Sequence, residues 1–367
     1  MNTPSQKNNF LWSDVLEKPV DLQISLFRQA SSQLNANDVK YGFRAFASDL
    51  FARDLISVAE YVTIFGGHVI KCVTPDQSGI FRDMATGTDA STLTEVYSRA
   101  KYGRVKDIKY LADVLISYLC EELEKPHSEW FNLFQSAKLS GDNVVMMTTG
   151  WRNVPSMANI LYEIVVEEGN VKLAHIALPT IINIKLPRIA PPCEDYASLS
   201  LEEREYFNLT QDHVIPAENF YRWSGVHVIF GDDVLVTGST ADKVLFESIQ
   251  SGAKSFRAIY PIAIDPRVAL IDASVEDRLN SVVIGQKLNN IVADLVSEEN
   301  YQPVLRTLRL LFGESNRGEL ERFLPKIPAL VWLKLYKSAL NNDFLGQASC
   351  APSLITLRIY LNKLGLL

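Results

Sequence analysis

Residues 226–240 read VHVIFGDDVLVTGST, and this stretch decides the fold that we expect for the chain. Its apolar first half is typical of a buried strand, and two adjacent acids, Asp232 and Asp233, follow that strand. The turn at 237–240, TGST, then leads into a helical pattern. A strand, a polar turn and a helix in this order predict one unit of a parallel α/β sheet.

The chemistry of this turn suits a phosphorylated sugar. A helix N-terminus carries unpaired N–H groups that attract phosphate, and Gly238 lets the backbone approach a ligand closely. Thr237, Ser239 and Thr240 offer hydroxyl donors, while the two acids can accept hydrogen bonds from sugar hydroxyls. The alternative is an ordinary βα loop with a helix N-cap. The stretch is no P-loop, because the lysine of that motif is absent.

The same residues resemble the signature of type I phosphoribosyltransferases, in which apolar residues, two acids and a short apolar stretch precede Thr-Gly-x-Thr. Val236 departs from the pattern, since threonine is common there. The resemblance implies that Asp232 and Asp233 hold the ribose hydroxyls of phosphoribosyl pyrophosphate, and that residues 236–240 bind its 5′-phosphate. It is specific over residues 226–240 and extends over roughly 140–265.

The neighbouring elements follow the order expected for this family. The apolar run NVVMMT at 143–148 predicts a buried strand, and a helical pattern beginning at Pro155 follows it. Together with a further strand these elements form a βαβ unit, which normally has a right-handed crossover. We therefore expect strands at 143–148, 171–178, 226–230 and 255–262, and helices at 155–170 and 241–251.

The resemblance places the pyrophosphate at the loop after the first of these strands. Its candidate ligands are Thr149, Gly150, Trp151 and Arg152. Arg152 offers a planar cation with several donors for phosphate oxygens, and a surface arginine is the alternative interpretation. The loop sequence departs from the family's familiar versions.

Residues 179–223 form a long irregular segment where the family has a lid that closes over the reacting ribose. Its length is also compatible with acceptor binding or partner contact. The candidate phosphate contacts here are Lys185, Arg188, Arg204 and Arg222, each of which could instead be a solvated charge. Asp265, after the last core strand, is a candidate general base or a turn-capping residue before Pro266.

The implied reaction is substitution at the anomeric carbon, with pyrophosphate leaving through a transition state that resembles an oxocarbenium ion. Positioning and charge stabilisation would supply most of the rate. Mg²⁺ would bridge ligand oxygens with few direct protein ligands, and Asp232 or Asp233 could reach it through water. We therefore expect both acids to be exposed in a cleft.

The length of 367 residues suits two or three domains. Apolar residues recur at helical spacing in residues 43–55 and 93–125, the latter with a break near Gly103, whereas residues 74–92 read as a loop. We expect an α/β class with a parallel-sheet phosphoribosyltransferase-like core between helical regions. The boundaries are a loosely ordered lead at 1–20, a helical region at 21–138, the core at 139–270 and a helical region at 271–367.

The composition is that of a globular protein, with 47% hydrophobic and 22% charged residues. A net charge of −7 disfavours a nucleic-acid binder that uses its whole surface. The four cysteines lack metal-ligand spacing and read as free thiols, which favours a reduced, cytoplasmic setting. No apolar run reaches membrane-spanning length. His175 and His227 lie in predicted strands and read as buried core residues.

Three functions remain open. The first is a transferase that moves a phosphoribosyl group from phosphoribosyl pyrophosphate, or another ribose phosphate, to an acceptor in nucleotide metabolism. The second is a non-catalytic regulator that binds a sugar phosphate or nucleotide. The third, by analogy of architecture alone, is a toxin-like effector of a bacterial anti-phage system of the retron type. The sequence leaves the acceptor and the oligomeric state open.

The C-terminal region adds a candidate partner surface. Four arginines lie rather close together in the sequence and could meet an acidic protein or RNA, or form a solvated helix face. They are Arg306, Arg309, Arg317 and Arg322.

Overall fold

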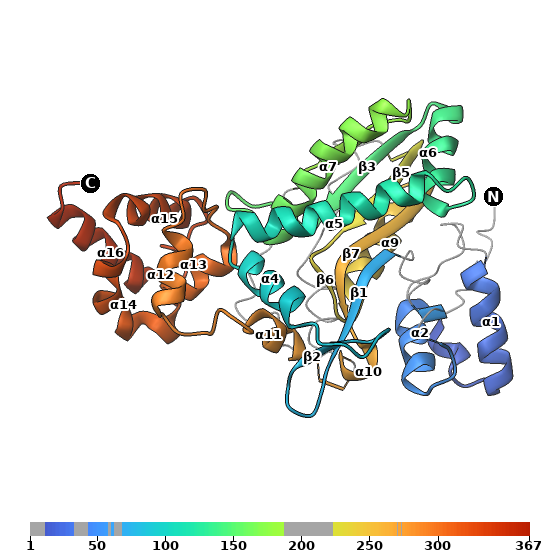
Figure 1. Ribbon diagram of the computed structural model, residues 1–367, viewed down its shortest axis with the longest axis horizontal. Coiled ribbons are helices and arrows are strands. Elements are labelled where there is room, and N and C mark those ends of the chain that lie inside the picture. The colour runs from blue at the N-terminus through green and yellow to red at the C-terminus, as the bar shows by residue number, and fades with distance from the viewer. Residues whose placement is uncertain are drawn as a thin grey trace, which may run out of the picture.

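The computed structural model describes residues 12–32, 43–57, 60–61, 68–186, 223–269, 271–272 and 274–367. A mostly parallel sheet lies at the centre of the chain, with helices on both of its faces (Figure 1). The expected α/β class is confirmed.

The sheet runs in the order β2-β1-β7-β5-β3-β4, with β6 also pairing with β7. Only β2 pairs antiparallel among the strands of the described residues. The strands are β1 (His68–Pro75), β2 (Phe81–Asp83), β3 (Asn143–Thr148), β4 (Ile181–Ile184), β5 (Val226–Gly231), β6 (Val234–Leu235) and β7 (Ser255–Ile264).

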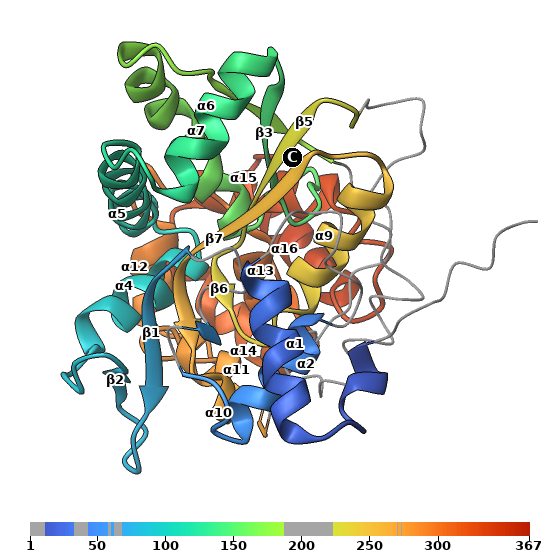
Figure 2. The ribbon, with the colours of Figure 1, turned by 90° about the vertical axis from the view of Figure 1, so that its right-hand side faces the viewer.

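Two apolar cores cover the two faces of this sheet, because successive strand residues point to opposite sides. In β3, Val144 and Met146 join one core, and Val145 and Met147 join the other. The first core contains residues of α4 (Ser91–Lys101), α5 (Val105–Leu123), α6 (Glu129–Ser140) and α7 (Met157–His175). The second contains residues of α1 (Val20–Ser32), α2 (Phe43–Ala52) and α9 (Ser239–Gln250). Figure 2 shows these two helical layers on either side of the strands.

The strand order creates a topological switch point between β3 and β5. From β3 the chain passes to β4 on one side of it, and then returns to β5 on its other side. The carboxyl ends of β3 and β5 lie side by side, with Thr148 in register with Gly231. In open α/β sheets ligands bind outside the carboxyl ends of the strands at such a point.

The second predicted core strand is wrong. Residues 171–178 do not form a strand, because α7 continues through Gly169 and Asn170 to His175, and the strand β4 comes later. A short apolar run cannot be assigned to helix or strand by periodicity alone. The side chain of Asn170 faces out of the helix to bond both backbone groups of Ile181, at 2.8 and 2.6 Å, so it joins α7 to β4 instead of ending the helix.

The N-terminal region is not purely helical, which corrects the expected boundary at 138. Strands β1 and β2 lie within residues 21–138, and β1 pairs with β7 in the central sheet. The segment predicted as a loop at 74–92 therefore includes β2. Residues 1–11 of the expected lead lie outside the described residues, as do residues 187–222 of the long segment with Arg188, Arg204 and Arg222.

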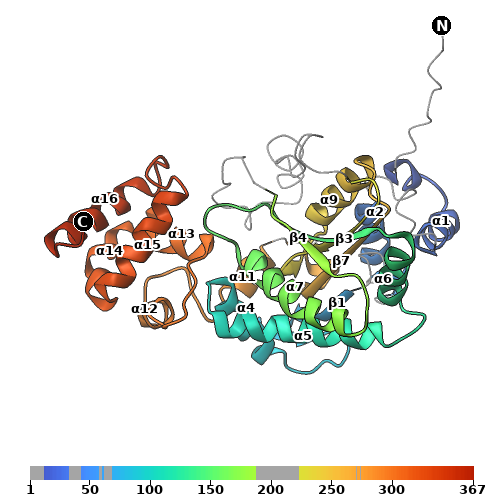
Figure 3. The same ribbon diagram turned by 90° about the horizontal axis from the view of Figure 1, so that it is seen from above.

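The expected helical C-terminal region is confirmed. Its last five α-helices pack around the buried Trp332 in a third apolar core, which also takes in Tyr102 and Val154 from the α/β part. They lie beside one end of the sheet (Figure 3). They are α12 (Asn290–Val296), α13 (Leu305–Phe312), α14 (Arg317–Phe323), α15 (Ala329–Asn341) and α16 (Ala351–Lys363). The two helices before them, α10 (Pro266–Ala269) and α11 (Val275–Asn280), contribute Ala269, Val275 and Leu279 to the first core instead.

Within the described residues, no helix combines the length and apolar character needed to cross a membrane. Cys72, Cys120 and Cys350 are free thiols. His175 lies at the end of α7 and not in a strand, whereas His227 lies in β5 and is buried, with Nδ1 2.7 Å from Ser255 Oγ.

Candidate functional site

Asp232 and Asp233 lie at a break in the sheet. The pairing of β5 with β7 ends at Gly231 and Ile259, and β6 resumes the pairing with β7 at Val234 and Ile262. Pro261 lies within this interval of β7, and proline has no N–H to donate to a neighbouring strand. The two acids are therefore placed where a central ladder is interrupted.

Tyr162 of α7 fixes the backbone at this break. Its hydroxyl donates to the carbonyl oxygens of Asp232, at 3.0 Å, and Ile259, at 2.5 Å. Its ring lies so close to Gly231 that a Cβ there would approach ring carbons to 2.6 Å. Gly231 is therefore required, because a side chain at this position would clash with the ring of Tyr162. The same tyrosine of α7 also fixes the backbone of Asp232.

Asp233 is buried, with 5% of its surface exposed, which contradicts the expectation that both acids are exposed in a cleft. Its Oδ2 lies 2.6 Å from Nζ of Lys101, the last residue of α4. The same ammonium group is 4.0 Å from Oε1 of Glu276 in α11. Lys101 was not predicted as a site residue, because it lies 132 residues from Asp233 and no local pattern marks it.

Asp232 is partly accessible and behaves differently from its neighbour. Its Oδ1 accepts a hydrogen bond from the backbone N–H of Asp233 at 2.9 Å. Burial, and then the negative charge of Asp233, raise the pKa of Asp232 to about 8. The raised pKa favours the protonated form of Asp232, which can donate a hydrogen bond as well as accept one.

The turn after the acids has a backbone conformation that lets a ligand approach it closely. Gly238 is the N-cap of α9 and has a φ of 78°, in the left-handed region that favours glycine. Val236 is buried in the first apolar core, whereas Thr237 and Thr240 are partly exposed. Asp242 lies in the first turn of α9, where its charge opposes an incoming anion. The side chain of Ser239 lies outside the described residues.

The predicted pyrophosphate loop begins beside the acids, since Thr148 pairs with Gly231. Asn159 of α7 fixes its start by donating to Thr148 Oγ1, at 2.7 Å, and to the carbonyl of Thr149, at 2.9 Å. The Asn159 side chain also completes a capping box with Ser156. The structure thus brings the two predicted ligand loops together at one edge of the sheet.

The middle of that loop is held from the β4 side. The backbone N–H of Trp151 donates to Leu186 O at 2.7 Å, and Lys185 Nζ lies 4.4 Å from the centroid of the Trp151 indole. Lys185 also pairs with Glu163, so part of its charge is already neutralised. Arg152 is partly exposed.

The far end of the loop is held by the C-terminal helical region. Asn153 donates its side-chain amide to Asn341 O, and Val154 N donates to Asn342 Oδ1 at 3.2 Å. The N–H of Leu305, the first residue of α13, donates to Pro155 O at 3.2 Å. These contacts join segments far apart in the sequence and were not predicted.

Asp265 fits the turn-capping interpretation. It is buried, and its Oδ1 accepts the backbone N–H of Arg267 at 3.0 Å at the start of α10. The guanidinium of Arg267 pairs with the same carboxylate. The carboxylate is therefore engaged by its own turn.

The four C-terminal arginines do not share one exposed face. Arg306 pairs with Asp277 at 3.0 Å and lies over the ring of Tyr102, 5.8 Å from its centroid. Arg317 and Arg322 are exposed. The predicted partner surface therefore keeps the exposed Arg317 and Arg322 but not Arg306, which is paired with Asp277.

A Mg²⁺ site built by the protein alone is not seen in the part of the chain that the structure describes, where no three His, Cys, Asp or Glu side chains gather as metal ligands. Asp232 is the accessible member of the motif pair, so it is the carboxyl that could reach such an ion.

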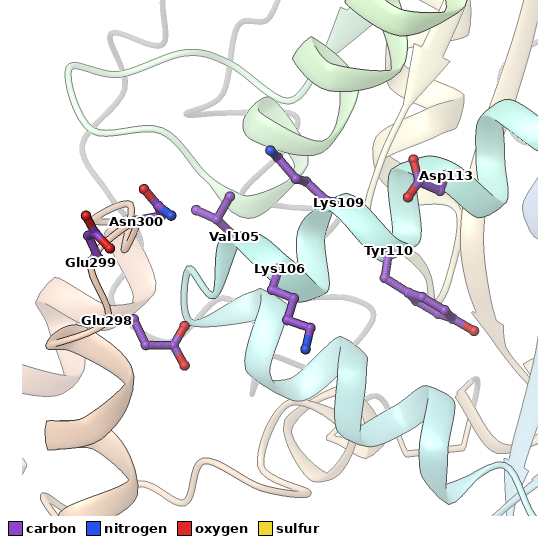
Figure 4. Close-up of a pocket in the computed structure, with 8 residues that line it drawn as sticks. All are labelled: Val105, Lys106, Lys109, Tyr110, Asp113, Glu298, Glu299 and Asn300. Atoms are coloured by element: carbon purple, nitrogen blue, oxygen red, sulfur yellow. The ribbon is translucent and has the colours of Figure 1, made fainter.

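A hollow of about 580 Å³ lies elsewhere, between α5 and residues 298–300 (Figure 4). None of its lining residues is a predicted site residue, and its charges are mixed. The residues that line the hollow are Val105, Lys106, Lys109, Tyr110, Asp113, Glu298, Glu299 and Asn300.

No protein-family model matches this chain, and a search of curated proteins found no significant match.

Proposed function

We propose that the chain binds phosphoribosyl pyrophosphate, or a related ribose 5-phosphate, at the carboxyl ends of β3 and β5 and transfers the phosphoribosyl group to an acceptor. One observation carries the proposal. The strand–acid–glycine-turn–helix segment and the loop at 149–152 are distant in sequence, yet both follow strands that pair in register at the switch point.

Each part of the site has a role in this proposal. Asp232 meets the ribose hydroxyls, the turn around Gly238 and the N-terminus of α9 receive the 5′-phosphate, and Arg152 meets the pyrophosphate. The raised pKa of Asp232 lowers its negative charge near neutral pH, which reduces its repulsion of the anionic ligand. A Mg²⁺ bound with the ligand would neutralise phosphate charge. Catalysis would follow from positioning of the leaving group and shielding of the ribose.

Binding is tested by calorimetric titration with phosphoribosyl pyrophosphate and Mg²⁺, and with ribose 5-phosphate alone. We expect binding by the wild type and its loss in Asp232→Asn and Gly238→Val. Asp113→Asn is the matched control, because Asp113 is an exposed aspartate that lines the separate hollow on α5. Equal affinity of the wild type and both site variants would end the proposal.

The second candidate is a non-catalytic regulator that binds the same ligand. The ion pair of Asp233 with Lys101 favours it, because one of the two acids is already engaged inside the protein. Pyrophosphate release, measured with candidate acceptors and with water alone, separates the two. Binding together with release supports the transferase, whereas tight binding without release under every condition supports the regulator.

A further inference from the structure

The ammonium group of Lys101 lies among buried carboxyl groups. Its ammonium group lies 2.6 Å from Asp233 and 4.0 Å from Glu276, and only 14% of its side chain is exposed. The ring of Tyr97, one helical turn earlier, lies 5.7 Å from the same nitrogen. An ionised aspartate in so dry a place depends on a charged partner, because an unpaired buried charge is strongly unfavourable.

The helix that carries Lys101 is anchored on both sides of it. Ser98 Oγ donates to Asn280 O at 2.7 Å and accepts the N–H of Val283 at 3.1 Å. One residue after Lys101, the carbonyl of Tyr102 accepts a hydrogen bond from Thr307 Oγ1 at 2.6 Å. The ammonium group is therefore held at a defined position by segments that come after the sheet in the chain.

A chain of contacts leads from this ammonium group to the accessible acid. Lys101 holds the Asp233 carboxylate, and the backbone N–H of Asp233 donates to Asp232 Oδ1 at 2.9 Å. The rotamer of Asp232 and the position of the loop thus depend on where the side chain of Asp233 is held. Asp233 itself, 5% exposed, presents almost no surface to a ligand.

We propose that Lys101 is a positioning residue for the ligand site: it keeps Asp233 inside the protein as an ion-pair partner and leaves Asp232 as the carboxyl that contacts the sugar. This inference rests on the proposed function, since it assigns roles within the same site. It divides the work of the two motif acids, which the sequence resemblance treats alike.

A charge-removal cycle tests the inference, with affinity for phosphoribosyl pyrophosphate and Mg²⁺ measured by calorimetry. Lys101→Met leaves Asp233 unpaired, and Asp233→Asn leaves Lys101 free to turn to Asp232, so each single change should weaken binding by about tenfold or more. The double variant Lys101→Met with Asp233→Asn removes both members of the ion pair, and it should regain most of the affinity that Lys101→Met loses. Lys101→Arg, which keeps the charge, should bind better than Lys101→Met.

Controls separate this inference from the proposed function. Lys106→Met removes an exposed lysine of α5 and should change nothing. Thermal unfolding reports the folding of every variant, and the neutral double variant remains informative where a single variant fails to fold. A double variant that folds but binds no better than the weaker single variant would overturn the inference, because Asp233 would then be a direct ligand contact. Absence of binding by the wild type would instead overturn the proposed function.

Discussion

Asp232 and Asp233 are chemically identical neighbours with opposite environments. Asp233 is enclosed beside Lys101, whereas Asp232 stays partly accessible at the edge of the sheet. The sequence predicted that a pair of acids follows the strand β5, and it could not predict that one of them is neutralised by a lysine of another helix. Residue type and spacing are local properties, but the charge state of a carboxyl depends on whatever the fold places around it.

Asp232 should make the protein less stable as the pH rises. Its folded-state pKa is raised to about 8, above its ordinary value near 4, so between these values the folded chain holds a proton that the unfolded chain releases. Stability therefore falls across this window, by at most about 1.4 kcal/mol per pH unit from this group. Asp232→Asn should flatten the fall, as urea unfolding at pH 5.5 and 7.5 would show.

Asp76→Asn is the control for this measurement. Hydrogen bonds from Ser78 hold the pKa of Asp76 near 2, below its ordinary value, so the stability it contributes is lost only as the pH falls well below 5.5. The difference between Asp76→Asn and the wild type should be the same at both pH values. Parallel curves for Asp232→Asn and the wild type would contradict the prediction.

Gly238 should resist substitution because of its backbone conformation. With a φ of 78°, a residue that carries a Cβ there should cost about 1–2 kcal/mol of unfolding free energy, and a β-branched residue more. We expect the order glycine, alanine, valine in decreasing stability by urea denaturation. Gly169 in α7 is the matched control, since a Cβ there meets nothing within 4 Å and Gly169→Ala should stabilise by about 0.4–1 kcal/mol.

At the scale of elements, the strands β3, β5 and β7 were predicted closely because each is a mostly apolar segment between turn residues. The strands β1, β2, β4 and β6 were missed. Residues 68–75 form the strand β1 because they pair with β7, the last core strand in the sequence. The strand β4 begins only at Ile181 because α7 continues to His175, beyond its predicted end. Pairing between distant segments leaves little trace in local periodicity.

The N-terminus of α7 should be a sensitive element, because Asn159 joins the helix to the loop after β3. Asn159→Ala removes its bonds to Thr148 and Thr149 together with half of the capping box, so we expect a loss of about 1–3 kcal/mol. Ser156→Ala should cost about 1 kcal/mol, since it removes the cap alone. Chemical denaturation would rank the two, and an equal or reversed order would refute this account of the loop.

At the scale of the whole molecule, the C-terminal helices are part of the site's support. They contact the end of α4 through Thr307 and the loop after β3 through Asn342, so both sides of the candidate site rest on them. Figure 3 shows these helices beside the α/β part, and the third apolar core joins the two through Tyr102 and Val154. We therefore expect the chain to unfold in a single cooperative transition.

Thr307→Val tests this coupling. It keeps the shape of the side chain but leaves the buried carbonyl of Tyr102 without its donor, so it should lower the unfolding free energy of the whole chain by about 1–3 kcal/mol. Thr356→Val on α16 is the control, because that hydroxyl bonds only the carbonyl one turn earlier, on a partly exposed face. If Thr307→Val instead produced a separate early transition of the C-terminal helices, the two parts would be independent units.

The sequence by itself determined the α/β class, the strand and turn that carry the acids, and the helical character of the last hundred or so residues, because apolar periodicity and turn chemistry act over a few neighbouring positions. The tertiary structure alone decided which acid faces a ligand, which lysine neutralises the other, and that the C-terminal helices hold the loop after β3. These depend on contacts between residues more than a hundred positions apart, and such contacts exist only once the sheet has assembled.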